Sequence, residues 1–237
     1  MSINALLVHG AGGGAWEWHV WRRVFAAAGA RADAIELAPV AAGLPGTRLA
    51  DYVGQVRATA LALPAPRVLV GASLGGLIAT LVADAVEAAA LVLVNPGIGR
   101  PANPGSPTPG RRSRDGVVAW SRTGIARTRR AMPDADDAAC LYAAARWRDE
   151  SAAALDDARV AQPAPPRCPV LVLASERDDD VPCADSRALA QEWRSDFVQL
   201  SGASHVGPLL GRDAARVAEL ALGWLETRRA SQGATRA

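Results

Sequence analysis

The fold is decided by one stretch of the chain, Arg67-Val68-Leu69-Val70-Gly71-Ala72-Ser73-Leu74-Gly75-Gly76-Leu77-Ile78-Ala79-Thr80. Its first four residues predict a buried β-strand, and the residues from Leu74 onward predict a helix. Between them, the Gly-x-Ser-x-Gly pattern allows a tight strand-to-helix turn that exposes the hydroxyl of Ser73. The N–H of Leu74, at the helix N-terminus, would then point to where an oxyanion forms. An alternative is that Ser73 only caps the helix.

Short apolar runs alternate with longer helical patterns on both sides of this stretch. Runs that are apolar throughout are typical of strands buried on both faces of a parallel sheet. The predicted strands are residues 5–8, 32–37, 67–70, 90–94, 170–174 and 197–200. The predicted helices are residues 18–28, 49–63, 74–88, 184–194 and 213–228. We therefore predict an α/β fold with a mostly parallel, doubly wound sheet.

A long interval separates the fourth predicted strand from the fifth. It begins with a Pro/Gly/Ser-rich stretch, residues 96–110, continues with helical patterns at 117–130 and 135–160, and ends with a proline cluster. An ordinary crossover needs far fewer residues, so we predict a helical lid inserted into a single domain. The predicted core is residues 1–96 and 167–229, the predicted lid is residues 97–166, and the tail 230–237 is expected to fray.

Composition and charge exclude several classes of protein. A chain of 237 residues that is 50% hydrophobic can bury a substantial core without metals or disulfides. The formal net charge of +2 gives no indication of nucleic-acid binding, and no apolar run has the length of a membrane span. The three cysteines show no CxxC spacing, so we expect no metal site. Since no signal-peptide pattern begins the chain, we expect a cytoplasmic protein.

Two later strands end in residues that can do acid–base chemistry. The fifth predicted strand is followed by an acidic turn, and any of its four acids could orient a histidine: Glu176, Asp178, Asp179 and Asp180. The last predicted strand is followed by His205, one of only three histidines. A neutral imidazole is well suited to removing a serine proton near pH 7. The carboxyl ends of parallel strands meet at one edge, so we expect these groups near Ser73.

A glycine-rich turn follows the first predicted strand, with the sequence His9-Gly10-Ala11-Gly12-Gly13-Gly14-Ala15-Trp16. The N–H of Ala11 is placed there to act as a second oxyanion donor opposite Leu74. The same segment fits the Gly-x-Gly-x-x-Ala pattern of dinucleotide-binding folds, with Glu36 where a ribose-binding acid would stand. Bulky tryptophans begin the next helix and the chain has no lysine for a Tyr-Lys pair. A nucleotide site would also leave the serine, acid and histidine unexplained, so the oxyanion interpretation is favoured.

Taken together, these motifs resemble the α/β-hydrolase family over the whole chain. Within that family the chain looks like the small group that includes plant methylesterases and hydroxynitrile lyases. The matching residues are 9–11, 14–16 with Trp18, 28–29, 51–53 and the turn through Gly76. The resemblance implies an α/β-hydrolase fold with no cofactor or metal. It also implies a catalytic triad of Ser73, Asp178 and His205. Ala11 and Leu74 would then be the two oxyanion donors.

The chain departs from the lyases of this group at two positions. Cyanohydrin-cleaving relatives have a lysine directly after the catalytic histidine and a threonine in the oxyanion turn. This chain has Val206 and Ala11 there. We therefore expect an esterase that cleaves a small, largely apolar ester or thioester through an acyl-enzyme. The alternative is a non-hydrolytic elimination, cyclisation or acyl transfer at the same Ser/His site.

The predicted lid carries the residues that bear on specificity. Trp120 and Trp147, together with Trp16, could line an apolar substrate pocket, although such side chains also serve in packing. From Arg100 to Arg130 there are eight arginines against one acid, Asp115. They form either a solvated surface or an entrance for an anionic substrate or an acyl-carrier partner. The oligomeric state is not indicated by the sequence.

Overall fold

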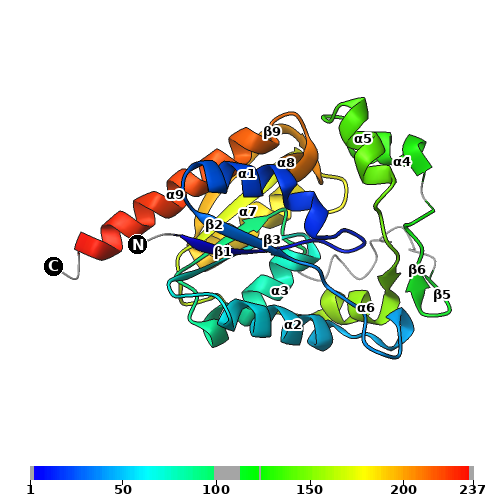
Figure 1. The fold of residues 1–237 in the computed structure, drawn as a ribbon, viewed down its shortest axis with the longest axis horizontal. Coiled ribbons are helices and arrows are strands. Elements are labelled where there is room, and N and C mark those ends of the chain that lie inside the picture. Colours follow the sequence, from blue (N-terminus) through cyan, green and yellow to red (C-terminus); the bar gives the residue numbers. More distant parts are fainter. Residues whose placement is uncertain (1–2, 99–112, 123, 235–237) are drawn as a thin grey trace.

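The computed structural model describes residues 3–98, 113–122 and 124–234. In this part of the chain, six parallel strands form the central sheet in the order β2-β1-β3-β4-β8-β9 (Figure 1). Their bounds are β1 (Asn4–Val8), β2 (Arg31–Ile35), β3 (Arg67–Ala72), β4 (Ala90–Val94), β8 (Val170–Arg177) and β9 (Asp196–Ser204). The predicted mostly parallel sheet is confirmed. The order reverses at β1, which is flanked by β2 and β3, and such a switch point is where open α/β sheets bind ligands.

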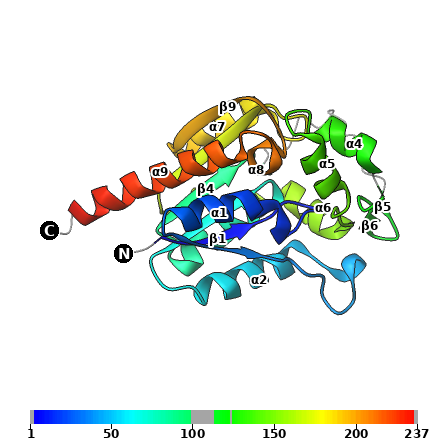
Figure 2. The ribbon, with the colours of Figure 1, turned by 45° about the horizontal axis from the view of Figure 1, so that its top comes forward.

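Alternate residues of each strand enter two separate apolar layers. Leu7 belongs to the layer under α1 (His19–Ala27) and α9 (Ala214–Ala234). Leu6 belongs to the layer on the other face of the sheet, under α2 (Leu49–Leu61), α3 (Leu74–Ala83) and α7 (Cys183–Trp193). Figures 1 and 2 show α1 and α9 on one side of the sheet and α2 on the other. Burial on both faces explains why the four inner strands, β1, β3, β4 and β8, are largely apolar.

Between β4 and β8 lie residues 113–122 and 124–160, which we call the insertion; their buried side chains join the two apolar layers of the core. It contains a three-stranded antiparallel sheet of β5 (Ser113–Arg114), β6 (Val117–Val118) and β7 (Glu150–Ser151). Its helices are α4 (Gly124–Ala131), α5 (Asp137–Ala144) and α6 (Ala152–Val160). In Figure 1, α4, α5 and the small sheet lie beyond one end of the central sheet. Most of the Pro/Gly/Ser-rich stretch, from residue 99, lies outside the described residues.

The predicted helices of the insertion were wrong in part. Residues 117–118 form β6, so the first helix begins only at Gly124. The predicted helix 135–160 is broken in two by β7. Capping side chains begin both pieces, since Asp136 accepts the N–H of Ala139 (2.8 Å) and Ser151 accepts that of Ala154 (3.1 Å).

Smaller differences concern the ends of elements. Three short helical turns are present at η1 (Ala15–Trp18), η2 (Leu44–Gly46) and η3 (Asp84–Val86), and α8 (Gly207–Leu210) follows the last strand. Helix α9 continues to Ala234. That the tail 230–237 frays stays a prediction. Within the described ranges, no helix is long and apolar enough to cross a membrane.

Candidate active site

Ser73, the predicted nucleophile, lies at the turn between β3 and α3. Its backbone has φ 51° and ψ −121°, a left-handed conformation that costs a non-glycine residue about 1–3 kcal/mol. A Cβ on Gly71 would overlap the carbonyl of Gly75, and one on Gly75 would overlap that of Val8, so both positions require glycine. The Ser73 hydroxyl makes no capping hydrogen bond to the helix described here. The capping alternative is therefore not supported.

His205 and Asp178 are joined at the same edge of the sheet. Nδ1 of His205 donates to Oδ2 of Asp178 at 2.7 Å, and the Asp178 side chain is fully buried. The other carboxylate oxygen of Asp178 accepts the N–H groups of Asp180 (2.8 Å) and Val181 (2.7 Å). By contrast, Glu176 accepts the N–H of Gly202 and is exposed. The geometry thus favours Asp178 among the four acids of this turn.

The environment of His205 favours a basic imidazole. Burial opposes the charged ring, but the hydrogen bond and the negative charge of Asp178 outweigh it, so the pKa of His205 is raised. Because Nδ1–H points to Asp178, Nε2 is the ring nitrogen left to take a proton. Among the described residues, no hydrogen bond joins the Ser73 hydroxyl to His205. Such contacts often tighten only when substrate binds.

Asn95 is a residue of the site that sequence reasoning missed. It follows β4 with φ 45° and is almost fully buried. Its side-chain amide donates to the carbonyl of His205 (2.8 Å) and to the hydroxyl of Ser175 (2.9 Å). The one available signal was a polar residue placed directly after a fully apolar strand.

The glycine-rich turn after β1 lies directly against Ser73. A Cβ on Gly10 would be 3.1 Å from the Cβ of Ser73. Several N–H groups of the turn have acceptors inside the protein: Gly12 donates to Glu150 (3.1 Å), Gly13 to the Gly10 carbonyl (3.3 Å), Gly14 to Glu17 (3.4 Å) and Ala15 to Glu36 (2.8 Å). In the described part of the chain, the N–H groups of Ala11 and Leu74 donate to no other group. They are the two groups that the sequence predicted as oxyanion donors.

The contacts of Glu36 and His9 explain the turn without a nucleotide. Glu36 accepts the Ala15 N–H and pairs with Arg148, so the acid proposed for a ribose is already engaged. Burial lowers the pKa of His9 to about 4, which keeps it neutral. Its Nε2 accepts the N–H of Leu37 (3.1 Å), so the proton resides on Nδ1 and is donated to the Gly10 carbonyl (2.8 Å). Within the described ranges, no cluster of three His, Cys, Asp or Glu side chains could hold a metal.

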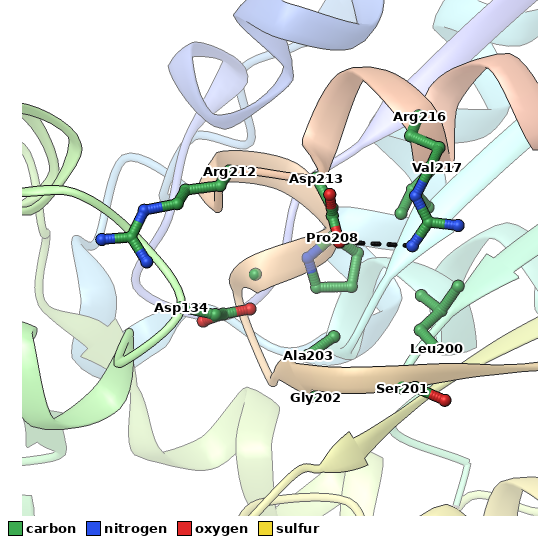
Figure 3. A pocket seen from close by; sticks show the side chains of 11 residues that line it. Asp134, Leu200, Ser201, Gly202, Ala203, Pro208, Arg212, Asp213, Arg216 and Val217 are labelled. Carbon is green, nitrogen blue, oxygen red and sulfur yellow. Dashed lines mark hydrogen bonds and ion pairs between the residues drawn. The ribbon is translucent and has the colours of Figure 1, made fainter.

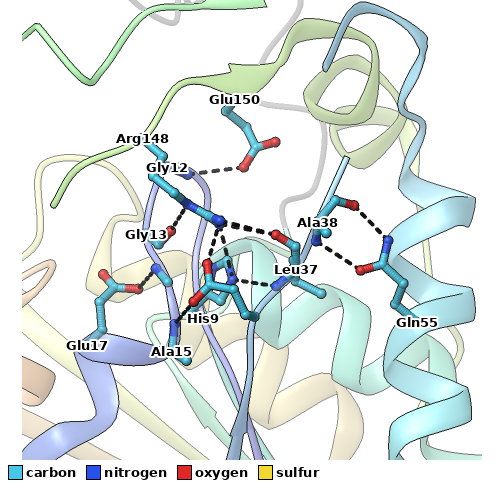
Figure 4. Close-up of polar contacts among 12 residues, drawn as sticks. His9, Gly12, Gly13, Ala15, Glu17, Leu37, Ala38, Gln55, Arg148 and Glu150 are labelled. Atoms are coloured by element: carbon cyan, nitrogen blue, oxygen red, sulfur yellow. Dashed lines mark hydrogen bonds and ion pairs between the residues drawn. The ribbon is translucent and has the colours of Figure 1, made fainter. Parts of the chain in front are cut away.

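Two residues of the insertion, Arg148 and Glu150, form hydrogen bonds with the glycine-rich turn (Figure 4). The backbone N–H of Arg148 donates to the Gly12 carbonyl (2.8 Å), and its Nε donates to the Gly13 carbonyl (2.7 Å). The Glu150 carboxylate accepts the Gly12 N–H. The insertion thus forms hydrogen bonds with both the N–H groups and the carbonyl groups of the turn.

Glu17 is a second group that the sequence did not reveal. It lies in η1, 6% exposed, and one carboxylate oxygen accepts the Gly14 N–H. Burial raises the pKa of Glu17 to about 8, against the effects of the Gly14 N–H, the His205 charge and Arg148. At neutral pH this acid is therefore protonated.

The three tryptophans predicted for a pocket fall into two places. Trp16 and Trp147 pack edge to face, with ring centroids 5.1 Å apart. The Trp120 ring lies so close to Gly12 that a Cβ there would overlap it, so this ring covers the glycine-rich turn. A cavity of about 300 Å³ lies elsewhere, along the outer side of the loop that carries His205, between Asp134 and Arg216 (Figure 3). The substrate pocket stays a prediction.

Comparison with known proteins defines the class. The model of the alpha/beta hydrolase family matches residues 5–220, and the chain belongs to this family. Family and fold together support an enzyme of the hydrolase type. No curated protein matches the chain in sequence.

Solved structures share the fold over nearly the whole chain. The methylesterase MES16 from Arabidopsis is 18% identical with a TM-score of 0.74, covering 93% of this chain and 98% of that one. A pyrethroid hydrolase from Sphingobium faniae JZ-2 is 20% identical with a TM-score of 0.74, covering 95% and 98%. Tomato methylketone synthase I, in complex with 2-tridecanone, is 16% identical with a TM-score of 0.75, covering 96% and 99%. The expected likeness to the methylesterase group is confirmed in the fold.

Proposed function

We propose that the protein is a serine esterase that cleaves a small, largely apolar ester or thioester through an acyl-enzyme. The observation that supports this most is the 2.7 Å contact between His205 and the buried Asp178, at the edge that also carries Ser73. The N–H groups of Ala11 and Leu74, which donate to no acceptor among the described residues, add the donors that a tetrahedral oxyanion needs.

The proposed reaction has two steps. The Ser73 hydroxyl attacks the substrate carbonyl while Nε2 of His205 takes its proton, and Asp178 stabilises the imidazolium. The N–H groups of Ala11 and Leu74 bind the oxyanion, and His205 returns the proton to the leaving alcohol or thiol. Water activated by His205 then attacks the acyl-enzyme and frees the acid and Ser73.

A second candidate is a non-hydrolytic reaction on the same scaffold, such as elimination, cyclisation or acyl transfer. The likeness to tomato methylketone synthase I, which extends over 96% of this chain, is compatible with it at the level of the fold. In such a reaction His205 would act as a base without an acyl-enzyme.

We also propose that the arginine-rich insertion binds an anionic substrate or an acyl-carrier partner, and that the protein is cytoplasmic. Exposed arginines described there include Arg122, Arg127 and Arg130.

Replacement of the nucleophile tests the proposal. Ser73→Ala should reduce hydrolysis of p-nitrophenyl esters by about 10⁴-fold or more, because nucleophile and base act as a unit. The matched control is Ser201→Ala, an exposed serine in β9, which should keep full turnover. Steady-state kinetics on proteins with equal circular dichroism spectra make the comparison. Turnover of Ser73→Ala within tenfold of the wild type would exclude the acyl-enzyme and favour the non-hydrolytic candidate.

A further inference from the structure

Glu150 is a buried carboxylate of the insertion that the proposed reaction does not use. It lies in β7, is 3% exposed, and accepts three hydrogen bonds from described residues. One oxygen, Oε1, accepts the Tyr52 hydroxyl (2.7 Å) and the Ser151 N–H (2.8 Å). The other, Oε2, accepts the Gly12 N–H (3.1 Å). A buried charge is tolerated when its lone pairs are satisfied in this way.

The two oxygens of Glu150 have separate tasks. Oε1 connects β7 to α2 and to the Ser151 N–H, whereas Oε2, among the described residues, accepts a hydrogen bond only from Gly12 of the glycine-rich turn. The Gly12 N–H belongs to the peptide that follows Ala11, so fixing this N–H fixes the backbone on one side of the Ala11 N–H. Gly12 has φ 69°, a conformation that glycine adopts without strain and that its own backbone does not enforce. The turn therefore depends on its partners for its orientation.

We propose that Glu150 is a positioning residue of the oxyanion site: by accepting the Gly12 N–H, it holds the turn that presents the Ala11 N–H. The insertion is then part of the catalytic machinery as well as a cover. This inference rests on the proposed function. Oxyanion donors act because they are oriented before charge develops, and a misplacement of about 1 Å can cost about 10²-fold in rate.

The isosteric variant Glu150→Gln tests this directly. Glutamine offers one oxygen and one NH₂ group to three donors. Its oxygen should face the two donors on the Tyr52 side, which leaves the NH₂ group against the Gly12 N–H. The expected result is a fall in kcat of about 10- to 100-fold with KM within threefold. Hydrogen exchange of the peptide that contains Gly12 should become faster.

Ser151→Ala is the matched control on the same strand. It removes the contact with the Thr47 carbonyl (2.6 Å) and the cap of α6, so it weakens the insertion without touching Gly12. It should lower the melting temperature and leave kcat and Gly12 exchange unchanged. If Glu150→Gln does not fold, Glu150→Asp takes its place, since the shorter carboxylate withdraws from Gly12 and should also lower kcat.

The outcomes separate this inference from the proposed function. A wild type that hydrolyses no ester contradicts the proposed function, and Gly12 exchange still reports whether Glu150 holds the turn. An active wild type whose Glu150→Gln variant keeps kcat within twofold overturns only the present inference. It is also overturned if kcat falls equally in Glu150→Gln and Ser151→Ala in step with melting temperature, because the role is then structural.

Discussion

Two loops lie at the edge of the sheet that carries Ser73, and each accepts support from a carboxylate of the insertion. The glycine-rich turn is held by Glu150, which is buried, and by Arg148. The loop of His205 is held by Asp134, which accepts the N–H (3.0 Å) and the hydroxyl of Ser204. Asp134 is only partly buried and lines the open cavity of Figure 3.

The difference lies in what else supports each loop. His205 also contacts two residues of the central sheet's edge, Asp178 through its ring and Asn95 through its carbonyl. The glycine-rich turn accepts support from two sources. His9 and Glu17 contact it from the core, and Arg148 and Glu150 contact it from the insertion. The sheet can therefore orient His205, the proposed base, without the insertion. The turn that carries the Ala11 N–H, a proposed oxyanion donor, is instead held by residues of both the core and the insertion. The predictions below test this contrast.

Asp178→Asn should have the largest effect on the histidine side. An amide favours the wrong tautomer of His205, and we expect a loss of kcat on the order of 10³–10⁴-fold. Without the negative charge the pKa of His205 falls, so the acidic limb of kcat/KM should move to lower pH. The control is Asp179→Asn, an exposed neighbour that should change little. Equal small losses in both variants would show that another acid, such as Glu176, orients the base.

Asp134→Asn should have a much smaller effect, about tenfold or less in kcat. The amide keeps one acceptor for Ser204, and Asp178 and Asn95 still hold His205. Asp213→Asn is the control in the same cavity, since Asp213 pairs with the exposed Arg216 and should leave kcat unchanged. The measurement is kcat of the three variants, Asp134→Asn, Asp213→Asn and Asp178→Asn, on the same ester. A loss as large as that of Asp178→Asn would refute the view that the sheet alone orients the base.

Glu17→Gln should affect activity least and the pH dependence of stability most. The pKa of Glu17 rises from 4.5 to about 8 on folding, so between these values the unfolded state has released a proton that the folded state keeps. Stability should therefore fall as pH rises from about 4.5 to 8, and the variant should lose this slope. Urea unfolding across that range measures it, with exposed Glu219→Gln as control. Parallel curves for the wild type and Glu17→Gln would mean that Glu17 ionises normally.

The sequence predicted the sheet well because its signals are local. The four inner strands are short, largely apolar runs, and Ser73, Asp178 and His205 each directly follow a strand end. The serine turn was identifiable because glycine is required on both sides of it. Leu74 was predicted as an oxyanion donor from this serine turn, and Ala11 from the separate glycine-rich turn after the first strand.

The insertion could not be predicted in the same way, because its shape depends on distant partners. Arg148 and Glu150 leave the helical pattern to contact residues 12–13, about 135 positions earlier in the chain. Nothing in the sequence around Glu150, Asp134 or Glu17 distinguishes these acids from the exposed acids nearby. Their burial and their acceptor roles follow only from the folded arrangement.

The most direct test of the account is whether Ser73 is activated by His205. An isolated serine hydroxyl is a poor nucleophile, and a base within hydrogen-bond reach makes it reactive. A serine-directed organophosphonate should add one group to the wild type, located on Ser73 by peptide mass spectrometry, and none to His205→Ala. A folded wild type that stays unlabelled, or a His205→Ala variant labelled as fast as the wild type, would contradict the account.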